Sequence, residues 1–319
     1  QKALYEDTEL VSRITETERL HQQAWNKVLY KSDAGLHGVT PWYAEDYDDS
    51  DWEKVDMFSD NWAIRNGRPL NGVHWFRKDF FVPEDWSGKE AVLRLGCIVD
   101  ADSVFVNGHF VGTVSYQYPP RIYKVPSKLL KKGKNQLTVR LFSYGGRPSF
   151  VKEKPYKLIC DGKEVNLEGG WKHKIGTVMP PSPSSTAFHY TPVGLYNGMI
   201  YPLRHYTFKG VVWYQGESNV GRWSEYSSLL SALIADWRTL FKDENLPFYI
   251  IELADFLAPD DPGRAAWAEL RKQQAKTARE NAHVTLIKNS DTGEWNDIHP
   301  LDKKTAATRL VEAVIQNEK

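Results

Sequence analysis

The sequence predicts two kinds of structure in one chain: a doubly wound α/β sheet of parallel strands towards the C-terminus, and a β jelly roll before it. From about residue 191 onward, apolar runs alternate with amphipathic helical stretches, which is typical of a parallel sheet with helices on both faces. Between about residues 52 and 171 the hydrophobic period is two, and Gly and Pro turns separate the segments. Many short strands without a helix indicate a sandwich or jelly roll.

The first part of the chain is predicted to be helical. Between residues 8 and 30, apolar side chains recur at the spacing of one or two helices. After Ser32 the sequence changes to loop-forming residues, which include Gly35 and Pro41 and end in an acidic run at 45–51. We therefore expect regular structure to stop near residue 32.

The middle of the chain is expected to form short antiparallel strands. Residues 75–82 alternate in polarity around charged Arg77 and Asp79. Asn107-Gly108 supplies the two positive φ angles of a tight hairpin turn. Further strands are predicted at 91–95, 103–106 and 137–142. Together these segments indicate one β module.

The last part of the chain alternates strands with helices. Residues 210–214 (GVVWY) form a continuous apolar run, as expected of a strand that is buried on both faces. Further strands are predicted at 247–253 and 284–288, and helices at 226–241, 264–281 and 301–316. In such a sheet, ligands bind beyond the carboxyl ends of the strands.

Composition argues against several classes of function. The 41 basic residues balance 41 acidic residues, so no positive field favours nucleic acid. No apolar run approaches the roughly 18 residues of a membrane span, and no Cys or His cluster has metal-ligand spacing. Cys97 and Cys160 could pair or stay reduced. The 12 Trp and 16 Tyr residues fit either a jelly-roll core or a surface that stacks on sugar rings.

Two polar loops follow strands of the predicted parallel sheet, at 215–219 (QGESN) and at 291–300 (DTGEWNDIHP). Parallel strands bring their carboxyl ends to one edge, so we expect the two loops to meet. A histidine near a carboxylate, here His299 and Asp297, is the general-base unit of acyl transfer. An amide such as that of Gln215 can stabilise an oxyanion. The alternative is structural, since Asp297 or Asp302 could simply favour the N-terminus of the last helix.

These motifs resemble a known family. Residues 213–219 (WYQGESN) are similar to the signature of sialate O-acetylesterases and their carbohydrate-esterase relatives among the SGNH hydrolases. Residues 297–300 (DIHP) resemble the terminal block of that family, and residues 191–200 (TPVGLYNGMI) look like its segment before the first motif. The middle of the chain resembles the galactose-binding-like jelly roll that these enzymes carry as an insertion, and also the sugar-binding domain of family 2 glycosidases.

The resemblance implies a flavodoxin-like, SGNH-type sheet and divides the chain into three parts. Residues 1–51 would be a helical part of the hydrolase domain and a linker. Residues 52–172 would be the inserted jelly-roll module. Residues 173–319 would be the C-terminal part of the α/β hydrolase domain.

The resemblance also implies roles for the motif residues. His299 would be the general base and Asp297 would orient it. Gln215 would be an oxyanion donor, and Gly216 would shape its loop. The supporting positions are Glu217 and Asn197.

The acid has an alternative. Much of the superfamily has its acid three residues before the histidine, where this chain has Asn296, whereas Asp297 lies two residues before His299. Asp291 is therefore the alternative acid.

The nucleophilic serine of this family lies on a Gly-rich loop after the first strand. Ser12 falls in the predicted helix and Ser32 in a polar loop, and neither lies beside such a turn. The chain opens at Gln1, with no initiator Met and no signal-peptide pattern. We therefore expect the nucleophile upstream of this sequence, with an N-terminal partner chain as one possible carrier. Ser218, in a tight turn after a strand, is the alternative nucleophile.

The resemblance implies a serine-type esterase that removes O-acetyl groups from sugars, first of all from sialic acids, without a metal or cofactor. Acetylated xylan or another sugar ester is the alternative substrate. A glycosidase using Glu217, Glu252 and Glu294 and a carbohydrate-binding protein without catalysis are the other hypotheses. The expected partner is an O-acetylated carbohydrate, with no nucleic acid and no membrane. The expected location is secreted, periplasmic or lysosomal.

Overall fold

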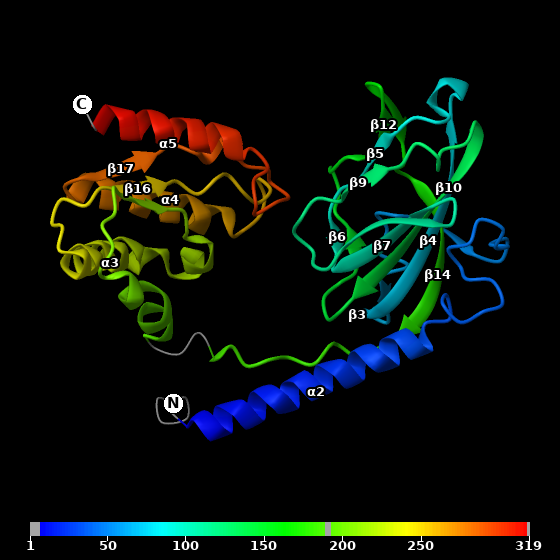
Figure 1. Ribbon diagram of the computed structural model, residues 1–319, viewed down its shortest axis with the longest axis horizontal. Helices are drawn as coiled ribbons and strands as arrows, with labels where there is room; N and C mark the ends of the chain where they lie inside the picture. Colours follow the sequence, from blue (N-terminus) through cyan, green and yellow to red (C-terminus); the bar gives the residue numbers. More distant parts are fainter. Residues whose placement is uncertain (1–6, 189–192, 318–319) are drawn as a thin grey trace. The chain divides into compact units, whose positions relative to one another are not determined.

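The computed structural model describes residues 7–188 and 193–317. The chain forms two compact units, one running to Thr186 and the other beginning at Ala187. We call them the β unit and the α/β unit (Figure 1). In the described ranges, no helix has both the length and the apolar character needed to cross a membrane.

The described part of the β unit contains one long helix, α2 (Thr8–Ser32), and two larger antiparallel sheets. The six-stranded sheet has the order β1-β14-β4-β10-β7-β8, and the four-stranded sheet has the order β13-β12-β5-β9. The elements are β1 (Glu53–Asp56), β2 (Ile64–Arg65), β3 (Arg68–Pro69), β4 (Gly72–Val82), η1 (Glu84–Trp86), β5 (Ala91–Leu95), β6 (Ile98–Val99), β7 (Ala101–Val106), β8 (His109–Val114), β9 (Ile122–Val125), β10 (Gly133–Ser143), β11 (Ser149–Phe150), β12 (Tyr156–Cys160), β13 (Lys163–Asn166) and β14 (Gly170–Val178). The strands predicted in the middle of the chain are confirmed.

Alternation along the strands builds the core between the two sheets. β4 and β10 pair along their whole length at the centre of the larger sheet. Their inward side chains, such as Phe76 and Val139, meet Leu93 of the smaller sheet in one buried cluster. The turn between β7 and β8 has φ angles of 48° at Asn107 and 79° at Gly108, so the hairpin prediction is confirmed.

The opposite face of the six-stranded sheet is covered by α2 and the loop that follows it. Trp25 and Leu29 of α2 pack in a second buried cluster with Trp75 of β4. Asp33, fully buried just after the helix, accepts hydrogen bonds from Trp75 Nε1 at 2.9 Å and from Arg140 Nε at 2.7 Å. These contacts anchor α2 to the sheet.

The β unit is therefore larger than the predicted module at 52–172. It includes α2 and the loop at 33–51, which the family resemblance implied to be part of the hydrolase domain, and it continues to Thr186. The physical reason is the apolar side of α2, which is buried on the sheet of this unit. Cys97 and Cys160 are both buried here and form no disulfide with each other.

The α/β unit is built on a parallel sheet with the order β15-β16-β17. Its elements are η3 (Tyr196–Ile200), η4 (Tyr201–Leu203), β15 (Val211–Trp213), η5 (Glu217–Glu225), α3 (Tyr226–Phe241), β16 (Phe248–Ile251), α4 (Arg264–Glu280), β17 (Val284–Ile287), η6 (Ser290–Thr292) and α5 (Lys303–Asn317). The predicted order of strands and helices is confirmed.

Helices cover both faces of this sheet (Figure 1). Phe248 and Ile250 of β16 point into a cluster with residues of α3 and α4. Tyr249 and Ile251 point the other way, into a cluster with Leu310 and its neighbours on α5. Because alternate side chains of β16 point to opposite faces, one set packs on α3 and α4 and the other packs on α5.

The prediction for residues 210–214 is wrong in one respect. β15 has β16 as its one neighbour in the part of the chain that the structure describes, and it lies at the edge of the sheet. Its central residue, Val212, is 52% exposed rather than buried. The apolar run therefore forms an open edge instead of a strand covered on both faces.

Candidate active site

The loop after β15 begins with a close packing contact. Gly216 is buried, and a Cβ built on it would lie 2.7 Å from Leu270 Cδ2 of α4 and 3.2 Å from Leu253 Cδ1. A side chain at this position would collide with the core. The glycine therefore lets the loop lie against α4.

Gln215 is fixed through both its backbone and its side chain. Its carbonyl oxygen accepts hydrogen bonds from Tyr226 Oη at 2.8 Å and from Gln274 Nε2 at 3.2 Å. Its side-chain Nε2 donates to Asn219 Oδ1 at 2.8 Å. An amide nitrogen has two N–H donors, so this bond orients the group while using one of them.

Glu217 and Ser218 follow at the start of η5. The Glu217 carboxylate accepts a hydrogen bond from the Gly216 N–H at 2.9 Å. Burial raises the pKa values of the Tyr214 and Tyr226 hydroxyls, and the negative charge of Glu217 adds to both shifts. Glu217 therefore shapes the electrostatics of the loop. Ser218 lies exposed on η5.

The loops after β15 and β17 meet at the carboxyl edge of the sheet. Asn289, fully buried just after β17, donates a hydrogen bond from Nδ2 to Tyr214 Oη at 3.1 Å. The buried Glu252, just after β16, accepts from the backbone N–H groups of Asn289 and Ser290 at 3.2 Å and 3.3 Å. All three strand ends are thus joined by hydrogen bonds.

The loop that carries His299 is held by packing on the segment after β16 and by hydrogen bonds within the loop. A Cβ on Gly293 would overlap the backbone of Asp255, so this loop packs directly on the segment after β16. The Asp297 N–H donates to Glu294 O at 3.1 Å. Asp297 is buried, and its Oδ1 accepts from the His299 backbone N–H at 2.9 Å, whereas the His299 side chain is exposed. The carboxylate therefore fixes the backbone on which the imidazole stands.

The alternative acid, Asp291, lies elsewhere in this loop. Both of its carboxylate oxygens accept hydrogen bonds from Arg309 of α5, at 2.6 Å and 2.7 Å. These bonds lower the pKa of Asp291 to about 2. The residue thus links the loop after β17 to α5.

Asn197 lies on η3, with its side chain exposed. Its backbone N–H donates to Val193 O at 2.9 Å. The preceding Thr191 and Pro192, which begin the family-like segment at 191–200, lie outside the described residues.

Sequence reasoning missed the residues that join the loops, namely Tyr214, Tyr226, Gln274 and Asn289. One signal was available, because Gln274 interrupts the apolar stripe of α4 that also contains Trp267 and Leu270. A buried polar residue needs a hydrogen-bond partner, and Gln274 contacts both Gln215 O and the Leu253 N–H. Among the described residues, no group of three His, Cys, Asp or Glu side chains is placed to hold a metal ion.

Each of the two units is similar to a known protein family. Residues 171–316 match the profile described as carbohydrate esterase, sialic acid-specific acetylesterase. The sialate O-acetylesterase of mouse is 33% identical over 136 residues, and that of rat is 32% identical over 174 residues. Residues 171–316 belong to the sialate O-acetylesterase family. Residues 12–172 belong to the sugar binding domain of glycosyl hydrolases family 2.

The matched segments make up a limited part of the relatives in this family. They cover 36% of this chain and 24% of the mouse protein, and 49% of this chain and 30% of the rat protein. The human sialate O-acetylesterase is 33% identical over 135 residues, or 36% of this chain and 25% of that protein. The chain thus spans about a quarter to a third of the length of the curated relatives it matches.

Two solved structures are distantly similar. A carbohydrate acetylesterase from Xanthomonas citri has 19% identity and a TM-score of 0.38, covering 75% of this chain and 70% of that one. A β-glucuronidase from Ruminococcus gnavus has 19% identity and a TM-score of 0.26, covering 38% and 23%.

Proposed function

We propose that the α/β unit supplies the general base and an oxyanion donor of a serine esterase that removes O-acetyl groups from sugars. The observation that carries this proposal is the joining of two loops at one sheet edge through Tyr214 and Asn289. One of these loops carries Gln215 and the other carries Asp297 and His299. Family membership supports the same chemistry.

In the proposed reaction, a serine hydroxyl attacks the acetyl carbonyl while His299 takes its proton. The tetrahedral oxyanion accepts a hydrogen bond from the Gln215 amide. Collapse of this intermediate breaks the ester bond, and the sugar oxygen leaves with the proton from His299. Water then hydrolyses the acetyl-serine by the same route, releasing acetate and regenerating the serine.

We propose that the nucleophile comes from a segment outside this sequence, either N-terminal to it or on a separate chain. Ser12 is exposed on α2, and Ser32 Oγ donates to Val28 O at 2.7 Å, so both belong to the helix of the β unit. The open edge of β15, with Val212 half exposed, is where a further parallel strand could pair. Such a strand would extend the sheet into the flavodoxin-like, SGNH-type arrangement.

The proposed substrate is an O-acetylated sialic acid, with acetylated xylan or another sugar ester as the alternative. We propose that the two antiparallel sheets of the β unit form a galactose-binding-like jelly roll that assists carbohydrate recognition. By analogy with the sialate O-acetylesterase family, the proposed location of the protein is secreted, periplasmic or lysosomal. The glycosidase hypothesis has less support, because Glu252 is buried and accepts two backbone N–H groups.

The test combines acetate release with trapping of the nucleophile. The chain alone, and the chain with the upstream segment of its full-length protein, are given 9-O-acetyl-N-acetylneuraminic acid. An alkyl fluorophosphonate then labels the activated serine, and peptide mass spectrometry locates the label. We expect turnover and labelling only with the upstream segment, and loss of both in His299→Ala. The control is His205→Ala, which changes an exposed histidine in the same unit.

Three results would change the proposal. Labelling of Ser218 in the chain alone, with turnover lost in Ser218→Ala, would place the nucleophile within this sequence. Full acetate release by His299→Ala protein would remove His299 from the mechanism. Hydrolysis of a nitrophenyl glycoside, with no acetate released from any sugar ester, would favour the glycosidase instead.

A further inference from the structure

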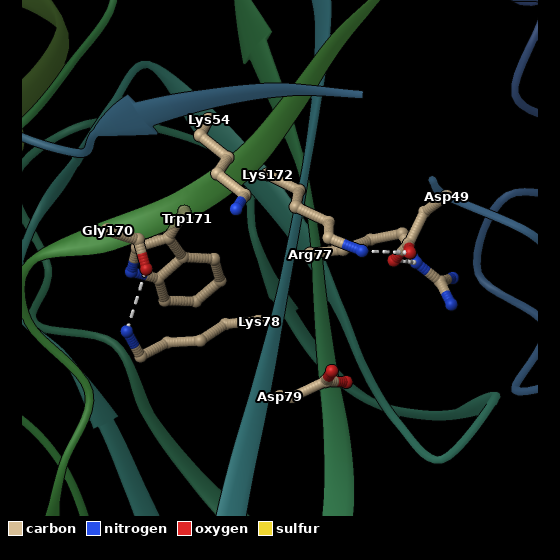
Figure 2. A pocket seen from close by; sticks show the side chains of 8 residues that line it. All are labelled: Asp49, Lys54, Arg77, Lys78, Asp79, Gly170, Trp171 and Lys172. Atoms are coloured by element: carbon tan, nitrogen blue, oxygen red, sulfur yellow. Dashed lines mark hydrogen bonds and ion pairs between the residues drawn. The ribbon is translucent and has the colours of Figure 1, made fainter. Parts of the chain in front are cut away.

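A pocket of about 250 Å³ lies on the β unit, where β1, β14 and β4 run side by side (Figure 2). Its wall includes four cationic side chains and two carboxylates, from Lys54, Arg77, Lys78, Lys172, Asp49 and Asp79. Its volume is suitable for one sugar ring with its substituents.

Strand register explains why cations gather here. Lys54 of β1 lies opposite Lys172 of β14, and Lys172 lies opposite Arg77 of β4. Side chains at facing positions of antiparallel strands lie on the same face of the sheet. Like charges placed directly opposite one another are unfavourable. This row of three cations therefore favours a bound anion.

Carboxylates of the protein neutralise part of this positive charge. Asp49 pairs with Lys172 at 2.5 Å and with Arg77 at 2.7 Å, and Figure 2 shows Lys172 turned toward it. Asp79 pairs with Lys134 at 2.9 Å, and Lys134 is not part of the pocket wall. Within residues 7–188 and 193–317, the Lys54 side chain makes no hydrogen bond or ion pair. The pocket thus keeps an excess of positive charge.

In Figure 2, the Lys78 side chain lies on the opposite side of the Trp171 ring from Lys172. Its Nζ donates to Glu168 O at 3.1 Å and to Gly170 O at 2.8 Å, and lies 5.7 Å from the centre of the Trp171 ring. An ammonium group has three N–H donors, so one remains for a ligand. Burial lowers the pKa of Lys78, which makes an added negative partner more favourable.

Gly170 lines the pocket and leaves open space beside it. A Cβ built on this residue meets no heavy atom within 4 Å. The position belongs to β14 and pairs with Asp56 of β1, so it has ordinary strand geometry. A branched side chain could therefore be introduced here to fill the pocket without changing its charge.

We propose that this pocket binds the carboxylate of an acidic sugar, with the hydroxyl groups of the ring donating to Asp49 and Asp79. A sugar acid fits better than a phosphate ester, because two carboxylates on the rim would repel a dianion but accept hydrogen bonds from hydroxyl groups. The saccharide part of this inference rests on the proposed carbohydrate function.

Binding is tested by calorimetric titration of the full chain with methyl β-D-glucuronide, methyl β-D-glucoside and sulfate. The two glycosides differ only at the carboxylate. We expect the glucuronide to bind about tenfold or more tightly than the glucoside and than sulfate, and to weaken as salt is added. Lys54→Met should weaken glucuronide binding at least about fivefold, as loss of one near-surface charge contact predicts. Gly170→Val should weaken it at least about fivefold too, because the added side chain would occupy the pocket.

The matched control is Lys124→Met, which removes an exposed strand lysine from the four-stranded sheet. Equal binding of glucuronide and glucoside would overturn the inference. So would sulfate binding as tight as the sugar acid, or wild-type binding by both pocket variants. Repeating the titration with His299→Ala separates the two proposals, since that change should abolish ester hydrolysis in the complete enzyme and leave this pocket unaltered.

Discussion

The buried carboxylate of Asp297 holds the backbone N–H of His299 at 2.9 Å. The exposed imidazole therefore stands on a peptide group that is fixed by a charged acceptor. A hydrogen bond to a carboxylate is stronger than one between neutral groups, so Asp297 stabilises the loop as well as supplying charge near the histidine.

Replacing Asp297 by alanine should destabilise the α/β unit by about 1–2 kcal/mol, because a partly buried N–H loses its acceptor. Asp297→Asn retains an acceptor oxygen and should cost less. Urea unfolding gives the free energies, and hydrogen exchange at the His299 amide reports the local effect. Wild-type exchange at that amide in Asp297→Ala would show that the bond does not hold the loop.

Gly216→Ala should destabilise the α/β unit by about 1–3 kcal/mol, because the added Cβ would meet Leu270. Gly221→Ala is the matched control, since a Cβ there meets no atom within 4 Å. Thermal unfolding followed by calorimetry compares the two variants. Equal midpoints for both would contradict the close packing of the loop on α4.

Asp33→Ala should strongly destabilise the β unit. It removes the acceptor of Trp75 Nε1 and leaves the Arg140 charge buried without its partner, and breaking a buried pair in this way typically costs about 3–5 kcal/mol. Glu164→Ala breaks an exposed pair with Lys157 and should cost less than about 1 kcal/mol. Chemical unfolding of both variants measures the difference, and similar losses would argue against the anchoring role of Asp33.

Two stacked histidines should make the β unit sensitive to acid. Burial lowers the pKa of His74 to about 4 and that of His173 to about 3. Unfolding returns both to about 6.5, so the unfolded state binds more protons below that pH. Stability should be constant above pH 6.5 and fall from there toward pH 4, by up to about 1.4 kcal/mol per pH unit for each histidine.

Urea midpoints measured at pH 7, 6 and 5 test this dependence. His173→Phe should reduce the slope by removing one titrating group, whereas His109→Gln changes an exposed histidine and should leave it intact. A midpoint that does not move between pH 7 and 5 would contradict the burial of the pair.

The predictions from sequence succeeded where the signal was local. The hairpin at Asn107-Gly108 follows from the φ angles of two adjacent residues, and α3 follows from the spacing of its own apolar residues. Burial of β15 was predicted wrongly because composition reports apolar character but not the number of neighbouring strands. The roles proposed for His299, Asp297 and Gln215 remain predictions.

The sequence by itself determined the kind and order of the elements and the placement of polar motifs after two strands, because helical and strand periods are written within each segment. Tertiary structure alone decided which sheet α2 covers, that Asp291 pairs with Arg309, and that Tyr214 meets Asn289. It also decided the row of Lys54, Lys172 and Arg77. These contacts join residues far apart in the chain, and they depend on strand register and helix packing, which no local pattern specifies.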